Sequence, residues 1–178
     1  MRHYDWTEID QIVFELKNSK VVIADTDTVM GMLALDREII CKMKRRKQSQ
    51  KIIRFIDNIN KIHNLTDKEK DVLKKYWPGK LSIIKNGEGY RMPNHPGINK
   101  LLEQLGEVYC SSANVHGHPP VLNDQEASKV FAKFNDQLVL IEGEQHDGAS
   151  STIIDFDLVK TLRTGSLDPS DIMKILRE

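Results

Sequence analysis

The sequence lacks several features that would assign it to a class at once. It carries no net charge at pH 7, because 26 Lys and Arg residues balance 26 Asp and Glu residues. No overall field therefore draws the chain to nucleic acid or a membrane surface, and any attraction for anions has to be local. No apolar run approaches the roughly 20 residues that span a bilayer, and the opening MRHYDWTEID lacks the apolar core of a signal peptide. We therefore expect a cytoplasmic protein without membrane contact.

Cysteine is also scarce, and its placement argues against disulfides. The two cysteines, Cys41 and Cys110, both lie beside apolar residues, which favours buried and reduced thiols. His116 and His118 are close in sequence, but no Cys or Asp ligand accompanies them, so we expect no metal site built from protein ligands. The 178 residues suffice for one core, and we expect a single domain over residues 1–178.

Apolar periodicity is present along nearly the whole chain and predicts a mixture of helices and strands. We expect helices over residues 7–18, 68–76, 98–105, 124–134 and 168–177, and strands over residues 21–24, 32–35, 52–56, 81–84, 90–92, 108–110, 138–141 and 153–154. The elements follow no strict βαβ order, and the Gly-rich fingerprints of Rossmann and P-loop proteins are missing. The predicted fold is a mixed α/β (α+β) domain, with a twisted, mixed, open sheet and flanking helices.

Small polar residues follow the predicted strand at Val108. Ser111, Ser112 and Asn114 come just before a turn that contains Gly117 and Pro119. Hydroxyl and amide groups at a strand end have to be hydrogen-bonded or hydrated, and ligands of open α/β sheets bind outside the carboxyl ends of strands. The stretch predicts an anion or nucleotide site, with an ordinary turn stabilised by Ser and Asn as the alternative.

Two further stretches repeat this arrangement of polar residues beside strands. Residues 25–31 (DTDTVMG) lie between two predicted strands, and residues 150–152 (SST) precede another. Their hydroxyls and carboxylates are suited to a small-molecule site, although a solvated turn would carry the same residue types.

The positive charge of this neutral chain is densest in one segment. Its basic residues are Lys42, Lys44, Arg45, Arg46, Lys47, Lys51 and Arg54, and no acidic residue lies between Cys41 and Ile56. An exposed, solvated helix face would explain such a segment, but the lack of local neutralisation favours binding of phosphate.

Several short motifs occur in a fixed order from about residue 21 to residue 165. They read DTDTVMGM (25–32), KRR (44–46), WPGKLS (77–82), RMPNHP (91–96), SAN (112–114), STIID (151–155) and RTG (163–165). In this order they resemble the motifs of the YrdC-like family, which includes the bacterial threonylcarbamoyl-AMP synthases of the TsaC type. Four residues depart from the family pattern: Asp25, Lys51 and Thr164 stand where the family has Pro, and Met30 where it has Tyr.

The resemblance implies an enzyme that converts ATP, bicarbonate and L-threonine to threonylcarbamoyl-AMP and pyrophosphate. The product would serve modification of an adenosine beside the tRNA anticodon, with transfer by partner proteins and Mg²⁺ delivered with ATP. Lys44 and Arg46 would be catalytic, and Ser112, Asn114 and Arg163 would join them in binding the nucleotide. Thr26 and Ser151 would hold threonine, with Arg91 or His95 near its carboxylate.

Other functions are compatible with the same residues. The basic segment could bind double-stranded RNA or tRNA without catalysis, and a weak tRNA contact could accompany an enzyme. A carbamoyl-transfer domain, as found in hydrogenase-maturation proteins, is a further alternative, although the acylphosphatase and zinc-finger regions of those proteins are not found in this sequence.

Overall fold

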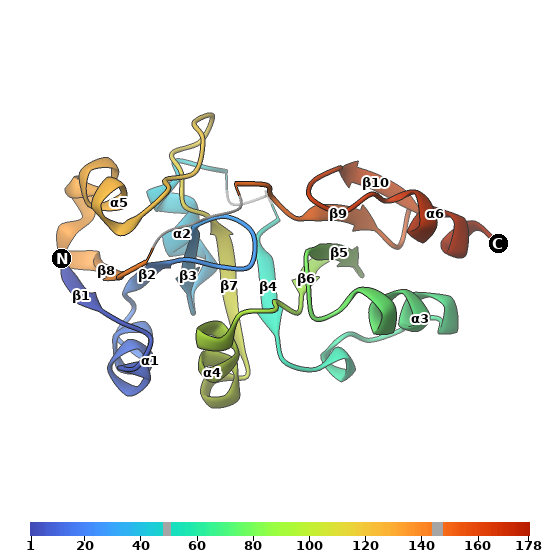
Figure 1. Cartoon of the computed structure of the whole chain (residues 1–178), viewed down its shortest axis with the longest axis horizontal. Coiled ribbons are helices and arrows are strands. Elements are labelled where there is room, and N and C mark those ends of the chain that lie inside the picture. The colour runs from blue at the N-terminus through green and yellow to red at the C-terminus, as the bar shows by residue number, and fades with distance from the viewer. Residues whose placement is uncertain (48–50, 144–147) are drawn as a thin grey trace.

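The computed structural model describes residues 1–47, 51–143 and 148–178. Within these ranges one sheet of ten strands extends through the molecule, in the order β1-β8-β2-β3-β7-β4-β6-β5-β9-β10 (Figure 1). The strands are β1 (Arg2–Tyr4), β2 (Val21–Ala24), β3 (Gly31–Ala34), β4 (Ile53–Ile56), β5 (Leu81–Lys85), β6 (Glu88–Arg91), β7 (Glu107–Ser112), β8 (Leu138–Ile141), β9 (Thr152–Asp155) and β10 (Lys160–Arg163).

Helices flank this sheet along its length. The helices are α1 (Ile9–Lys17), α2 (Arg37–Met43), α3 (Asp67–Tyr76), α4 (Pro96–Leu105), α5 (Asp124–Val130) and α6 (Ser170–Arg177), with 3-10 turns η1 (Ile59–Lys61) and η2 (Ala132–Gln137). Parallel pairs such as β2 with β8 occur beside antiparallel pairs such as β3 with β7. The mixed sheet with flanking helices confirms the predicted fold class.

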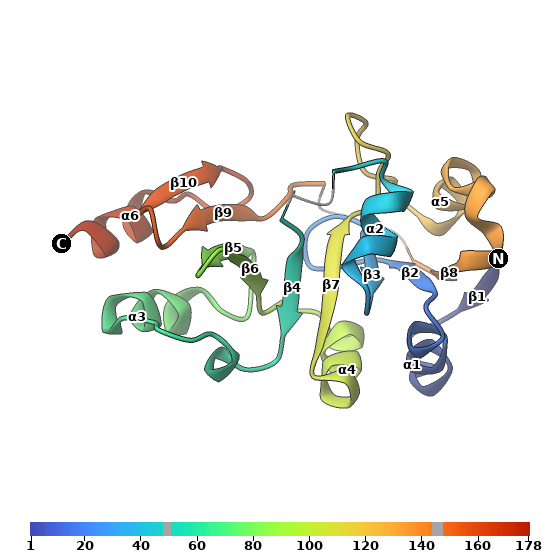
Figure 2. The same cartoon turned by 180° about the vertical axis from the view of Figure 1, so that it is seen from behind.

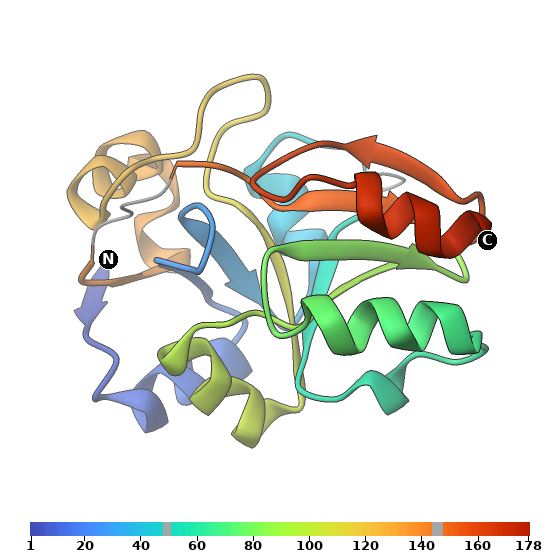
Figure 3. The ribbon, with the colours of Figure 1, turned by 45° about the vertical axis from the view of Figure 1, so that its right-hand side comes forward.

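The two halves of the sheet are covered differently. Around β2, β3, β7 and β8, α1 and α4 pack on one face, and α2 and α5 pack on the other (Figures 1 and 2). The half formed by β5, β6, β9 and β10 has α3 and α6 on one face, where the two helices lie side by side (Figure 3). The other face of this half is therefore available to line a pocket.

Alternation along the strands sorts side chains between core and pocket. Leu81 and Ile83 of β5 point into the core beneath α3 and α6, whereas Ser82 and Ile84 line the pocket. On β9, Ile154 enters the same core and Ile153 faces the pocket. Because successive side chains of a strand point to opposite faces, one strand can contribute side chains to the core and to the pocket.

Helix boundaries follow their capping residues in most places. The side chain of Thr66 accepts the backbone N–H of Glu69, and the Glu69 side chain accepts that of Thr66, which completes a capping box at the start of α3. Pro96 occupies the first turn of α4, where its missing N–H costs nothing. At α5 the expected helix is too long, because the α-helix ends at Val130 and the chain continues as η2, which is itself kinked at Phe134.

Helix α2 and strands β1 and β10 were not predicted from the sequence. Within α2, the buried Ile40 and Met43 are three residues apart, and Asp36 caps the helix by accepting the N–H of Glu38 at 2.8 Å. The basic segment therefore begins inside a helix. Strand β1 is short, and its pairing with β8 depends on tertiary contacts rather than on local sequence. None of the described helices is both long and apolar enough to cross a membrane.

Gly165 allows a close backbone approach that no other residue type would allow. A Cβ atom at this position would lie 2.0 Å from the carbonyl oxygen of Ser150 and 2.6 Å from the carbonyl carbon of Ser151. We expect Gly165→Ala to lower the free energy of unfolding by at least about 1–3 kcal/mol, because backbone atoms cannot move aside as a flexible side chain would. Chemical denaturation measures the change. Gly148→Ala is the matched control, since a Cβ there meets nothing within 4 Å; equal midpoints for both variants would contradict the prediction.

Candidate active site

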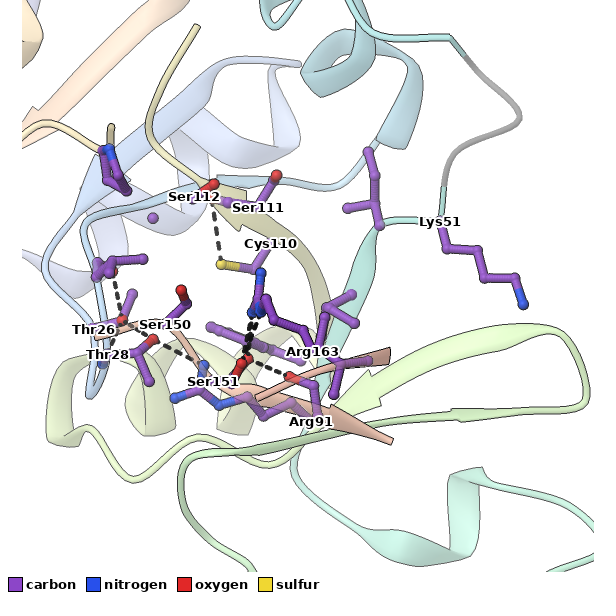
Figure 4. A pocket seen from close by; sticks show the side chains of 18 of the residues that line it. Thr26, Thr28, Lys51, Arg91, Cys110, Ser111, Ser112, Ser150, Ser151 and Arg163 are labelled. Carbon is purple, nitrogen blue, oxygen red and sulfur yellow. Dashed lines mark hydrogen bonds between the residues drawn. The ribbon is translucent and has the colours of Figure 1, made fainter. Parts of the chain in front are cut away.

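A pocket of about 410 Å³ lies where the two halves of the sheet meet. Its lining comes from the loop between β2 and β3, the start of β4, the end of β7, strands β5 and β6, the residues before β9 and the end of β10. Figure 4 shows Ser111 and Ser112 on one side, Thr26, Thr28, Ser151 and Arg91 on the other, and Arg163 between them. Residues far apart in the sequence thus converge on one cavity.

Lys44 lies beneath the end of β7 rather than in the pocket lining. Its side chain is 2% exposed, and its Nζ donates to the Ser112 carbonyl oxygen and to Asn114 Oδ1, the latter at 2.6 Å. The Ser112 hydroxyl donates to the same Asn114 oxygen at 2.6 Å. The buried ammonium group therefore fixes the polar turn whose side chains face the cavity.

Burial, and after it the charge of Arg46, lowers the pKa of Lys44 to about 8. An ordinary lysine side chain titrates near pH 10.4, so a substantial part of the Lys44 population is neutral at mildly alkaline pH. The interpretation of the whole basic segment as an exposed face is wrong at this position, because the sequence could not show which way the last turn of α2 points.

The lining of the pocket is rich in cations. Arg46 and Arg163 both line it, and Arg163 donates to the Ser151 carbonyl oxygen from Nε at 2.9 Å and from Nη2 at 2.8 Å. Partial burial, followed by the charges of Arg91 and Arg46, lowers the pKa of Arg163. No Asp or Glu is found among the lining residues in the part of the chain that the structure describes. This wall is suited to an anion.

Hydroxyl groups line the part of the pocket next to Arg163, which donates to the Ser151 hydroxyl at 3.0 Å. The Ser82 and Ser151 hydroxyls are 2.9 Å apart, and Arg91 Nη1 donates to the Thr28 hydroxyl at 3.0 Å. Arg91 also forms an ion pair with Asp27 and lies over the Phe55 ring, with its guanidinium carbon 5.4 Å from the ring centroid. Its position is therefore fixed before any ligand binds.

His95 does not lie where the family resemblance implied. It is outside the pocket lining, and both ring nitrogens are engaged: Nδ1 accepts the Ile98 N–H at 3.2 Å, and Nε2 lies 3.0 Å from Asp25 Oδ2. Burial opposes ionisation of Asp25, but hydrogen bonds from His95 and Trp6 outweigh it and lower the pKa of the carboxyl group. A direct contact between His95 and a bound amino acid has no support in this geometry.

The departures from the family pattern fall in different environments. Met30 is fully buried in the core beside α2 and α5, so it does not shape the pocket. Lys51 lines the pocket, Asp25 lies behind the lining, and Thr164 is exposed.

Several lining residues were not singled out from the sequence. Ser82 is an example, and its alternation with Leu81 and Ile83 is the signal that could have identified it. Cys110 also lines the pocket, but burial raises the pKa of its thiol to about 12, so it stays protonated at neutral pH.

Comparisons with known proteins agree with this architecture. A family model named Sua5_yciO_yrdC, described as "Telomere recombination", matches residues 15–165. A threonylcarbamoyl-AMP synthase of Bacillus subtilis is 25% identical, with 95% of this chain and 56% of that protein aligned. An uncharacterised protein of Mycoplasma genitalium is 24% identical over 92% of this chain, which spans only 39% of its length.

Among solved structures, P. abyssi Sua5 complexed with L-threonine has the same fold. Its TM-score is 0.82 at 24% identity, and the alignment covers 98% of this chain and 59% of that chain. The match to the family model covers most of the chain and includes every stretch that lines the pocket. The chain therefore belongs to the Sua5/YciO/YrdC family.

Proposed function

We propose that the protein is an L-threonylcarbamoyladenylate synthase, which converts ATP, bicarbonate and L-threonine to threonylcarbamoyl-AMP and pyrophosphate. The observation that carries this proposal is a single cavity whose lining combines Arg46 and Arg163, the cationic end, with Thr26, Thr28 and Ser82, the hydroxyl end; the two meet where Arg163 donates to Ser151. The names of the relatives support it. In the cytoplasm, partner proteins would transfer the threonylcarbamoyl group to the adenosine beside the tRNA anticodon, and a weak tRNA contact could assist delivery.

The reaction needs little covalent chemistry from the protein. The threonine amine adds to carbon dioxide derived from bicarbonate and loses a proton, which gives a carbamate. A carbamate oxygen then forms a bond to the α-phosphorus of ATP, while the bond from that phosphorus to the β-phosphate oxygen breaks and pyrophosphate leaves. Such a phosphorus-centred transfer is promoted mainly by positioning the reactants and neutralising their charge.

The cationic end would bind the phosphates. Arg46 and Arg163 reach the lining and would contact phosphate oxygens directly, whereas Lys44 would act from beneath by fixing Ser112 and Asn114. Contacts between a guanidinium group and a phosphate oxygen are charge-assisted and therefore stronger than neutral hydrogen bonds. ATP is expected to bring Mg²⁺, and the described lining offers the ion no carboxylate, so phosphate oxygens and water would hold it.

The hydroxyl end would bind threonine. Thr26, Thr28 and Ser151 are within the lining, and Arg91 has further N–H donors that could meet a carboxylate. No side chain is needed as a dedicated general base, because the neutral amine reacts with carbon dioxide directly.

Threonine-dependent release of pyrophosphate is the direct test. The purified protein is incubated with ATP, bicarbonate and threonine, and each reactant is omitted in turn. We expect release only when all of them are present, and threonylcarbamoyl-AMP as the co-product by mass spectrometry. Release without threonine would show a different acceptor, and salt-sensitive RNA binding without any release would favour the RNA-binding alternative.

Removing either lining arginine should slow the reaction. We expect Arg46→Ala and Arg163→Ala to lower kcat/KM for ATP by about ten- to hundredfold, because each loses one charge-assisted contact worth roughly 1.5–3 kcal/mol. Lys47→Ala is the control, since Lys47 is exposed and belongs to the same basic segment but does not line the pocket. Equal activity in all three variants would show that Arg46 and Arg163 do not bind the phosphates of ATP.

Lys44 should couple nucleotide binding to proton uptake. Its pKa of about 8 lies below the ordinary value, so part of the free protein carries a neutral Lys44 at pH 8. A bound polyphosphate favours the charged form and raises this pKa, so binding should take up as much as about half a proton at pH 8 and almost none at pH 7. Calorimetry in buffers of different ionisation enthalpy measures the uptake, which should vanish in Lys44→Met.

A further inference from the structure

The loop between β2 and β3 presents side chains in opposite directions. Thr26 and Thr28 line the pocket (Figure 4), whereas Asp25 and Asp27 are outside the lining and contact His95 and Asn94. The Thr26 hydroxyl accepts the Thr28 N–H at 3.0 Å and donates to the Val29 carbonyl oxygen at 2.7 Å, so hydrogen bonds within the loop join the two threonines. The groups that hold the carboxylates therefore set the position of the hydroxyls.

Both carboxylates reach the segment between β6 and α4. Asp27 pairs with Arg91, and its Oδ2 accepts the Asn94 N–H at 2.9 Å. Asp25 Oδ2 lies 3.0 Å from Nε2 of His95. Because Nδ1 of His95 accepts the Ile98 N–H, the ring proton is on Nε2 and is donated to Asp25. The pairing leaves the imidazole one orientation and one tautomer.

Trp6, near the N-terminus, also contacts the Asp25 side chain and the His95 ring; these three residues form the attachment of Asp25. Trp6 Nε1 donates to Asp25 Oδ1 at 2.8 Å, and its ring centroid is 5.2 Å from that of His95. The indole also lies against Gly97, where a Cβ atom would come within 2.2 Å of it. The absence of a side chain at Gly97 therefore allows the indole to reach the loop.

Two members of this attachment fall outside the matched family pattern. Trp6 precedes residues 15–165, which the family model matches, and Asp25 stands where the family motif has Pro. Proline has no carboxylate to accept these two donors. The hydrogen bond from Trp6 to Asp25 therefore joins two residues that the family pattern does not supply.

We infer that Trp6, Asp25 and His95 form a positioning relay, which holds Thr26 and Thr28 toward the amino-acid end of the pocket. The inference rests on the proposed function for the identity of the ligand, but its structural part does not. None of the relay residues lines the pocket, so they act through the loop. The relay should govern the affinity for threonine while leaving the cationic end unchanged.

Trp6→Phe tests the relay, because phenylalanine keeps an aromatic ring against Gly97 and removes only the N–H donor. We expect the KM for threonine to rise about fivefold, the factor for loss of one ordinary hydrogen bond, with kcat and the KM for ATP within about twofold of the unmodified protein. Asp25→Asn should raise the KM for threonine further, because the amide of Asn cannot accept hydrogen bonds from both Trp6 and His95 as the carboxylate does.

Tyr4→Phe is the matched control. It also removes a hydrogen bond from an N-terminal aromatic to a carboxylate, in this case from the Tyr4 hydroxyl to Glu15 at 3.2 Å, but Glu15 contacts no part of the loop in the described structure. The KM for threonine should be unchanged in this variant. Equal increases for both substrates in Trp6→Phe, together with a lower Tm, would show a merely structural role and overturn the proposal.

Hydrogen exchange separates failure of the relay from failure of the proposed function. Backbone amides of residues 26–31 should exchange faster in Trp6→Phe and Asp25→Asn than in Tyr4→Phe, whether or not the protein uses threonine. An unmodified protein that released no pyrophosphate with threonine would refute the function while leaving this comparison valid. Identical exchange in all variants would overturn the relay.

Discussion

The organisation of the site depends on positive charge gathered where little negative charge accompanies it. Arg46 and Arg163 share one cavity wall, Lys44 lies buried behind it, and the charge of Arg46 lowers the pKa of both other groups. Like charges held together in a partly dry cavity repel one another more strongly than they would in water. An anion relieves this repulsion, and so the geometry that is unfavourable in the free protein is favourable in a complex.

The sheet makes this convergence possible. Strands β7 and β4 link a half that is covered on both faces to a half that is covered on one, and the uncovered face closes over the end of β7. Side chains that alternate along β5 and β9 then stabilise the core with one set and line the cavity with the other. The same short strands therefore stabilise the core and line the pocket. This double use explains how a chain of 178 residues has room for the pocket.

The sequence predicted most elements, because periodicity and capping are local properties. Thr66 and Glu69 mark the start of α3, and the apolar run of β2 is a buried strand as expected. Local patterns could not predict the direction in which individual side chains point. Lys44 was expected to bind the nucleotide but is buried beneath the end of β7, and His95 was expected near the threonine carboxylate but caps α4 and contacts Asp25. Each outcome depends on residues distant in the chain.

The buried ammonium group of Lys44 has a consequence for the balance between folding and activity. Hydrogen bonds to Ser112 and Asn114 hold it in place, yet a lowered pKa means that the fold disfavours the charge it carries. A hydrophobic side chain at this depth would avoid that penalty, as buried ionic groups often give way to apolar ones without loss of stability. Lys44→Met would thus keep or raise the stability of the fold while removing the charge beneath the cavity, so stability and the proposed activity make opposite demands on this position.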